Sequence, residues 1–84
     1  MQFDYSALQK VIRQLREERN ISQEVFSGLA GISRSHLSMI EIGSKKPNLD
    51  TLHKIAQALD MSVSDLLRMQ EAEAEKDASS GADD

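Results

Sequence analysis

Two short helical segments meet at a junction of only two residues, and this junction constrains the fold more than any other feature of the chain. The first segment begins after Ser22, a residue type that caps helix N-termini, and Gly31 ends it. Ile32 follows, and Ser33 is again an N-cap residue, so the next helix starts at once. So short a turn forces the helices to cross steeply, and a glycine there avoids the Cβ clash of a positive-φ residue. The second helix is therefore expected to project from the body of the fold.

Similar start and stop signals divide the rest of the chain as far as Gln70 into helices. No stretch shows the alternation of apolar and polar residues that is typical of a strand. An apolar stripe followed by the helix-ending Asn20 predicts a first helix over about 6–19. Gly43 closes the third helix, Asn48 caps a fourth, and Ser62 opens a fifth. We therefore predict an all-α domain of five short helices. The apolar stripes of the first and fourth helices are Leu8, Val11, Ile12 and Leu15, and Leu52, Ile55, Ala56 and Leu59.

The negative charge of the chain is concentrated at its C-terminal end. Residues 71–84 hold six acidic residues against one lysine, a charge of −5, whereas residues 1–70 hold nine Lys/Arg and eight Asp/Glu, a charge of +1. The tail has no apolar side chain larger than alanine, so burial cannot offset the entropy of ordering it. We predict a domain over 1–69 and an acidic tail over 70–84 that is disordered beyond its first few residues. The tail is expected to be a solvating segment, with competition for a basic surface as the alternative.

The composition excludes several classes of protein. The chain has no cysteine and no apolar run long enough to cross a bilayer, so a disulfide framework, a thiolate metal site and a membrane span are excluded. The N-terminus lacks the layout of a signal peptide, which points to a cytoplasmic protein. There is no glycine-rich phosphate loop and no carboxylate pair in a catalytic setting, and His36 and His53 are well separated in the sequence. We therefore expect that the protein is not an enzyme and that it has no metal site and no cofactor.

Several signals at and around this junction occur in order: Ser22-Gln23, Gly31, Ser33, Ile40-Glu41, Gly43, Pro47 and the pattern Leu-x-x-Ile-Ala-x-Ala-Leu. The layout of the central helices is that of a helix-turn-helix, and through these signals the sequence resembles the phage-repressor/Cro (XRE) family. With the stretch VIRQLREERNI, the resemblance covers roughly residues 8–67. The chain is most similar to short stand-alone regulators such as restriction–modification controller proteins. The resemblance implies a five-helix, lambda-repressor-like domain that binds double-stranded DNA sequence-specifically and regulates transcription.

The helix that follows Ser33 has one side free for the major groove of DNA. Arg34 is the first candidate for reading a base, because its guanidinium can bond guanine O6 and N7 together. The resemblance implies base contacts also at Ser35 and Met39, and a phosphate contact at the glutamine after Ser22. Each of these residues also has an explanation that does not involve DNA: Ser33 caps a helix, and the other side chains are solvated as on any protein surface. The expected DNA-binding residues are Gln23, Ser33, Arg34, Ser35, His36, Ser38, Met39, Lys45 and Lys46.

Glu41 falls on the inward side of the same helix, and a buried carboxylate needs a partner. The resemblance implies that this partner is Arg16, at the edge of the apolar stripe of the first helix, with Arg19 as the less favoured choice. We expect the ion pair to be structural and to hold the third helix against the first.

A single domain reads about four or five base pairs, too few for selectivity in a genome. We therefore expect a homodimer on a palindromic operator, with half-sites about 34 Å apart. For Val63, Leu66 and Leu67, packing in the core of a single chain explains the apolar side chain as well as a dimer interface does. The expected dimer interface comprises the outer face of the fourth helix and the last helix, including Met61, Val63, Leu66 and Met69.

Three positions of the second helix depart from the family pattern. Gly28 stands where a helix former is usual and costs about 1 kcal/mol relative to alanine. Val25 and Leu29 are apolar where the family is often polar, so they either extend the core or mark a contact surface. The alternative function is accordingly an antitoxin or interaction module that binds a partner protein through these residues and the C-terminal helix.

Overall fold

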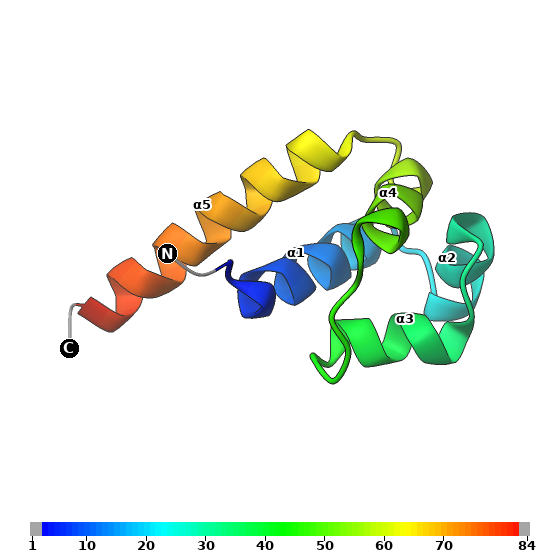
Figure 1. Cartoon of the computed structure of the whole chain (residues 1–84), viewed down its shortest axis with the longest axis horizontal. Helices are drawn as coiled ribbons and strands as arrows, with labels where there is room; N and C mark the ends of the chain where they lie inside the picture. Colours follow the sequence, from blue (N-terminus) through cyan, green and yellow to red (C-terminus); the bar gives the residue numbers. More distant parts are fainter. Residues whose placement is uncertain (1–2, 83–84) are drawn as a thin grey trace.

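The computed structural model describes residues 3–82, with side chains described for residues 3–77, and the regular structure of this part is entirely helical. The all-α fold predicted from the sequence is therefore confirmed (Figure 1). The first helix differs from its predicted range by one residue at each end. The elements are α1 (Tyr5–Glu18), α2 (Gln23–Ala30), α3 (Arg34–Glu41), α4 (Leu49–Ala58) and α5 (Val63–Ala82).

Side-chain caps fix where the helices begin. At α2 the Oγ of Ser22 accepts a hydrogen bond from the backbone N–H three residues later, and Ser33 does the same at α3. Asn48 caps α4 with its Oδ1, and Ser62 caps α5 with its Oγ. Each cap satisfies one of the N–H groups that a helix start leaves without a partner. The four caps expected from the sequence are therefore confirmed.

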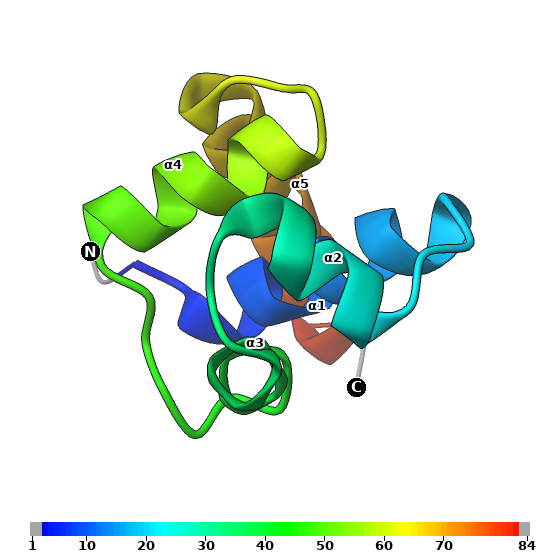
Figure 2. The same cartoon turned by 90° about the vertical axis from the view of Figure 1, so that its right-hand side faces the viewer.

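The core is built from side chains of all five helices. The helices α2 and α4 pack together, α1 packs against α3 and α5, and α4 packs against α5. Phe26 of α2 fills the centre and is fully buried. This packing leaves α3 at one edge of the molecule, as the end-on view of that helix in Figure 2 shows. The other fully buried large side chains are Leu8, Ile12, Leu37, Ile40, Ile55, Leu59 and Leu66.

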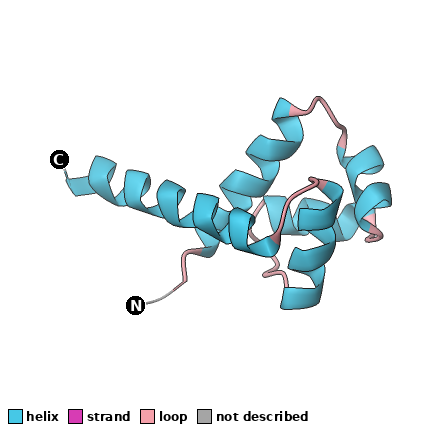
Figure 3. Cartoon of the chain, turned by 90° about the horizontal axis from the view of Figure 1, so that it is seen from above, coloured by secondary structure: helices cyan, strands magenta, loops and turns pink. Residues whose placement is uncertain are grey.

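The C-terminal segment differs from the sequence expectation, because α5 continues through the acidic residues to Ala82. Its end extends beyond the other four helices (Figure 3). Gln70 is buried and donates from Nε2 to the carbonyl of Asp4 at 3.4 Å, and Nζ of Lys10 lies 3.0 Å from Oδ2 of Asp77. These polar contacts with α1, together with the high helix propensity of Ala, Glu and Lys, order a segment that has no large apolar side chain. Asp83 and Asp84 lie outside the described residues.

Candidate nucleic-acid interface

The junction between α2 and α3 is closed by backbone hydrogen bonds around a left-handed glycine. Gly31 has φ +73° and donates to the carbonyl of Gly28 at 3.2 Å. Ile32 donates to the carbonyl of Ser27 at 3.0 Å, which completes the pattern known as a Schellman motif. The Ile32 side chain packs against the core, and Ser33 caps α3 directly afterwards. The turn therefore holds α3 at a fixed angle to α2.

The two faces of α3 have opposite environments. Leu37, Ile40 and Glu41 are buried against the rest of the domain. On the other side Arg34 and Ser35 are exposed, and farther along the helix Met39 is 39% exposed. Ile42, at the end of the same side, is 67% exposed. The outer face predicted from the sequence is therefore uncovered by the described part of the chain.

A shallow hollow of about 470 Å³ lies between this outer face and the start of α2. It brings together five of the residues expected to contact DNA, although they come from two different helices. Backbone N–H groups and the helix dipole at an α-helix N-terminus attract anions, so the α2 edge of the hollow suits a phosphate. His36 and Ser38 are both half-buried on the same helix. The residues that line the hollow are Gln23, Arg34, Ser35, Ser38 and Met39.

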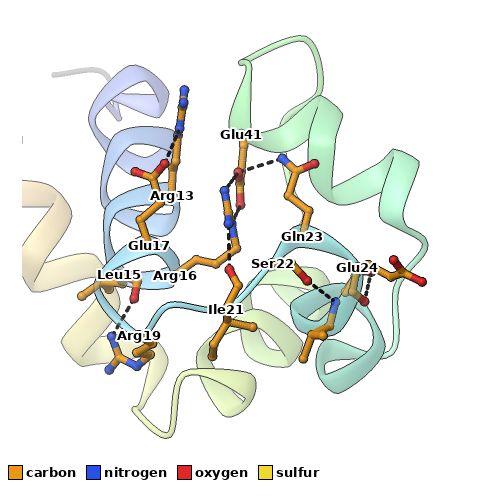
Figure 4. A network of polar contacts seen from close by, with 12 residues as sticks. Arg13, Leu15, Arg16, Glu17, Arg19, Ile21, Ser22, Gln23, Glu24 and Glu41 are labelled. Carbon is orange, nitrogen blue, oxygen red and sulfur yellow. Dashed lines mark hydrogen bonds and ion pairs between the residues drawn. The ribbon is translucent and has the colours of Figure 1, made fainter.

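The expected ion pair between Arg16 and Glu41 is present and ties α1 to α3. Nε of Arg16 lies 2.8 Å from Oε2 of Glu41, and Nη2 donates to Oε1 at 2.9 Å (Figure 4). The two side chains are 11% and 2% exposed. The hydrogen bond with Glu41 raises the pKa of Arg16 above its ordinary value. This bidentate geometry is the strongest form of an Arg–carboxylate contact.

The same carboxylate also fixes Gln23, a link that the sequence reasoning missed. Nε2 of Gln23 donates to Oε1 of Glu41 at 3.0 Å, while Nη1 of Arg16 donates to the carbonyl of Ile21 at 2.8 Å (Figure 4). Glu41 therefore joins α1, the start of α2 and α3 in one network. Because a primary amide has two N–H donors, Gln23 keeps one for a ligand in the hollow.

Arg19, the less favoured partner for Glu41, has a different role. Its guanidinium donates to the carbonyl of Leu15 at 3.0 Å and to that of Leu59 at 3.2 Å. It therefore links the end of α1 to the carbonyl at the end of α4, where a positive charge suits the helix dipole.

The loop after α3 carries Lys45 and Lys46, and both lysines are exposed, as is the neighbouring Ser44. The backbone N–H of Lys45 donates to the carbonyl of Met39 at 3.2 Å, which keeps the loop close to the end of α3. Nζ of Lys46 lies 4.9 Å from the ring centroid of Tyr5, and Phe3 packs edge-on against that ring. Cation–π contacts operate within about 6 Å of the ring centroid. Tyr5 was not predicted, because it is distant from the lysine in the sequence and no local pattern marks it.

The residues expected at a dimer interface divide into three groups by burial. Leu66 is a correction: its side chain is completely buried in the core of its own chain, so it has no surface to offer a second copy. Met61 and Val63 are half-buried against the same core. Met69 is 41% exposed and lines a groove of about 240 Å³ between α1 and α5.

No helix in the described part of the chain is long and apolar enough to cross a membrane. Over the same residues, no three His, Cys, Asp or Glu side chains come together in an arrangement that could hold a metal ion.

Two capped helices joined by a tight turn, with the second helix uncovered, define a helix-turn-helix protein. A family model described as Helix-turn-helix (HTH_3) matches residues 12–66, so the chain belongs to this family. This family is one of regulatory domains rather than of enzymes. The resemblance found in the sequence is thereby confirmed.

Among curated proteins, the HTH-type transcriptional regulator DdrOP3 of Deinococcus deserti is 39% identical over 56 residues, which cover 67% of this chain and 43% of that protein. The chain spans 26% to 62% of the length of the first curated relatives that it matches. Among solved structures, the wild-type restriction–modification controller protein C.Esp1396I has a TM-score of 0.81 and 26% identity, covering 90% of this chain and 99% of that one. The DNA-binding domain of the P22 c2 repressor has a TM-score of 0.69 and 27% identity, covering 80% and 86%.

Proposed function

We propose that this protein is a transcriptional regulator that binds double-stranded DNA sequence-specifically by inserting α3 into the major groove. The observation that carries this proposal is the uncovered outer face of α3 beside the hollow at the start of α2. An α-helix fits the major groove, where every base pair presents a distinct pattern of donors and acceptors. The likeness to regulators supports this function over that of an antitoxin.

Within this proposal, base reading falls to the first turn and a half of α3. Arg34 bonds a guanine, Ser35 and Ser38 bond a base or a phosphate, and Met39 packs against a thymine methyl group. His36 lies at the side of the same turn. These roles follow from exposure on the face that lines the hollow.

The phosphate contacts are assigned to both ends of this face. Gln23 and the capped start of α3 at Ser33 lie at one end, and Lys45 and Lys46 lie at the other. Contacts to phosphate add affinity without sequence information and make binding depend on salt.

We further propose that the protein binds a palindromic operator as a homodimer, because one copy of α3 reads too few base pairs. Two parts of the expected interface are accessible: Met69 on α5, and the outer face of α4 at Leu49, His53 and Gln57. Met61 and Val63 contribute only their exposed edges.

The test is selection of bound duplexes from a random-sequence pool, followed by mobility-shift titration of the best sequence. We expect a palindromic site, and we expect Arg34→Ala to weaken specific binding by about tenfold to a hundredfold, the usual cost of a lost bidentate base contact. The matched control is Arg13→Ala on α1, an exposed arginine outside both the expected DNA contacts and the expected dimer interface, which leaves the affinity unchanged. Wild-type protein that enriches no sequence would refute the proposed function. If Arg34→Ala binds the operator as tightly as wild type, the base-reading role of Arg34 is wrong, but the proposed function stands.

A further inference from the structure

Ile42, the C-cap residue of α3, carries an exposed aliphatic side chain that the proposed base contacts do not use. It is 67% exposed, although its backbone still follows the helix, with its N–H donating to the carbonyl of Ser38 at 3.0 Å. Gly43 follows with φ +84° and turns the chain away from the helix axis. The helix α3 therefore ends on an aliphatic side chain that the described part of the chain leaves uncovered.

Ile42 belongs to a stripe of four residues along the outer face of α3. Their spacing of i, i+3, i+4 and i+7 places them on one side of a helix. The stripe changes character along its length, because its first two members are serines and its last two are apolar. We call the last two, Met39 and Ile42, the apolar end of α3. The whole stripe is Ser35, Ser38, Met39 and Ile42.

The backbone at the apolar end is held by the loop that follows it. The carbonyl of Met39 accepts hydrogen bonds from the backbone N–H groups of Ser44 at 2.9 Å and Lys45 at 3.2 Å. It also accepts one from Oγ of Ser44 at 3.2 Å. Carbonyls in the last turn of a helix have no partner within the helix, so the loop supplies the missing donors. The apolar end is therefore a fixed surface rather than a fraying terminus.

The charges around the apolar end suit an approach to DNA. Glu41 is the only acidic residue between Arg34 and Lys46, and its side chain is 2% exposed and paired. Lys45 and Lys46 are exposed directly after the apolar end. A phosphate backbone can therefore pass close to this end of α3 without meeting an exposed carboxylate of the segment. Met39 also lines the hollow, so the apolar end is continuous with the proposed interface.

The size of the apolar end argues against a partner protein. Stable protein interfaces bury about 800 Å² on each partner, far more than two side chains provide. A base-pair edge needs much less area, and the apolar group that base pairs present in the major groove is the C5-methyl group of thymine. Figure 2 shows α3 end-on at the lower edge of the molecule, where a duplex can approach it. Thymine methyl groups are therefore the occupant that fits.

The spacing of the two apolar side chains matches the spacing of base pairs. Met39 and Ile42 are three residues apart, which is about 4.5 Å along the helix axis and about 60° around it. Consecutive base pairs of a duplex are about 3.4 Å apart. Two side chains with this separation reach methyl groups on consecutive base pairs more readily than two groups on one base pair.

We propose that Ile42 is a specificity-determining residue, which packs on the methyl group of a thymine in the base pair next to the one that Met39 contacts. Each half-site then carries two consecutive thymine-containing base pairs at the C-terminal end of α3. The inference deepens the proposed function and rests on it, because Ile42 reaches these methyl groups only when α3 lies in the major groove.

The test removes one methyl group at a time from the selected operator. Uracil in place of thymine keeps the base pair and its hydrogen-bonding groups and lacks only the C5-methyl group. Each thymine of one half-site is replaced in turn, and binding is measured by mobility-shift titration. We expect uracil at the thymine of Ile42 to weaken wild-type binding about fourfold, the usual worth of one buried methyl or methylene group.

Variants of the protein connect each methyl group to one side chain. Ile42→Ser binds the thymine operator about fourfold more weakly and no longer distinguishes uracil from thymine at that one position. Met39→Ala loses the distinction at one other position, and we expect the two positions to be adjacent. Ile42→Val keeps most of the distinction, because an aliphatic side chain remains. Since Ile42 is exposed, Ile42→Ser should melt within about 4 °C of wild type.

The matched control is Leu29→Ser on α2, which removes an aliphatic side chain of similar exposure outside the expected DNA contacts. Val25 and Leu29 are 56% and 62% exposed, so the expectation that they extend the core is wrong. We expect Leu29→Ser to keep the wild-type response to uracil at every position.

The inference is overturned, and the proposed function stands, if the operator is bound specifically but Ile42→Ser keeps the full wild-type response to uracil at every thymine. It is also overturned if Ile42→Ser weakens binding to thymine and uracil operators by the same factor, since Ile42 then contacts something other than a methyl group. Loss of binding to a partner protein with unchanged operator binding overturns it as well. Wild-type protein that enriches no sequence overturns both proposals.

Discussion

Replacing Glu41 with alanine tests how much of the fold depends on the network beneath α3. The carboxylate is 2% exposed and accepts three hydrogen bonds, two from Arg16 and one from Gln23. The substitution leaves the guanidinium, itself only 11% exposed, without its counter-ion. Breaking a buried pair in this way costs about 3–5 kcal/mol. For a domain of this size each kcal/mol lowers Tm by about 4–8 °C, so we expect a fall of about 12 °C or more.

The measurement is thermal and urea unfolding followed by circular dichroism. The control is Glu17→Ala, which breaks an exposed pair with Arg13 and changes the free energy of unfolding by less than about 1 kcal/mol. The double variant Arg16→Met/Glu41→Leu recovers most of the loss, because well-packed apolar residues replace a buried ion pair at little cost. The reasoning is refuted if Glu41→Ala unfolds within about 1 kcal/mol of wild type.

Three further predictions concern single contacts. Tyr5→Leu removes the ring beneath the ammonium of Lys46. We expect the upfield-shifted ε-methylene NMR signals of that lysine to return to ordinary positions, and DNA affinity to fall by no more than about fivefold. The control Tyr5→Phe keeps the ring, so the upfield shift and the DNA affinity are both retained. Gly31→Ala lowers the free energy of unfolding by about 1–2 kcal/mol in urea titration, because φ +73° strains any residue with a Cβ, and no change would show that the turn relaxes. The hydrogen bond from Lys10 lowers the pKa of Asp77 below its ordinary value of 3.8, so the Lys10–Asp77 contact is fully present above that pH and is lost as pH falls through the lowered pKa. Carboxyl NMR titration checks this, and Lys10→Gln should raise the pKa of Asp77.

The elements that sequence reasoning placed correctly are those with local causes. A cap at Ser22 or Ser33 requires only a side-chain oxygen and a backbone N–H three residues away, and the left-handed turn at Gly31 requires only a missing Cβ. The apolar stripes likewise follow from helical period. The outer face of α3 could be named in advance for the same reason.

The misjudged positions depend on neighbours distant in the chain. Leu66 looked available for a partner because its helix seemed to carry spare apolar surface, yet α1 and α4 both pack against α5. The acidic segment looked unable to order itself, but Lys10 and the carbonyl of Asp4 lie where Asp77 and Gln70 can reach them. The contact of Tyr5 with Lys46 has the same origin.

The sequence alone determined the number of helices, their starts and turns, and the identity of the exposed helix, because hydrogen bonds and periodicity within a few residues decide these features. Only the tertiary structure decided that Gln23 shares the carboxylate of Glu41 with Arg16, that Leu66 is enclosed and that Val25 and Leu29 are not. Burial and pairing are properties of how helices pack on one another, and packing joins residues whose separation along the chain carries no information about their distance in space.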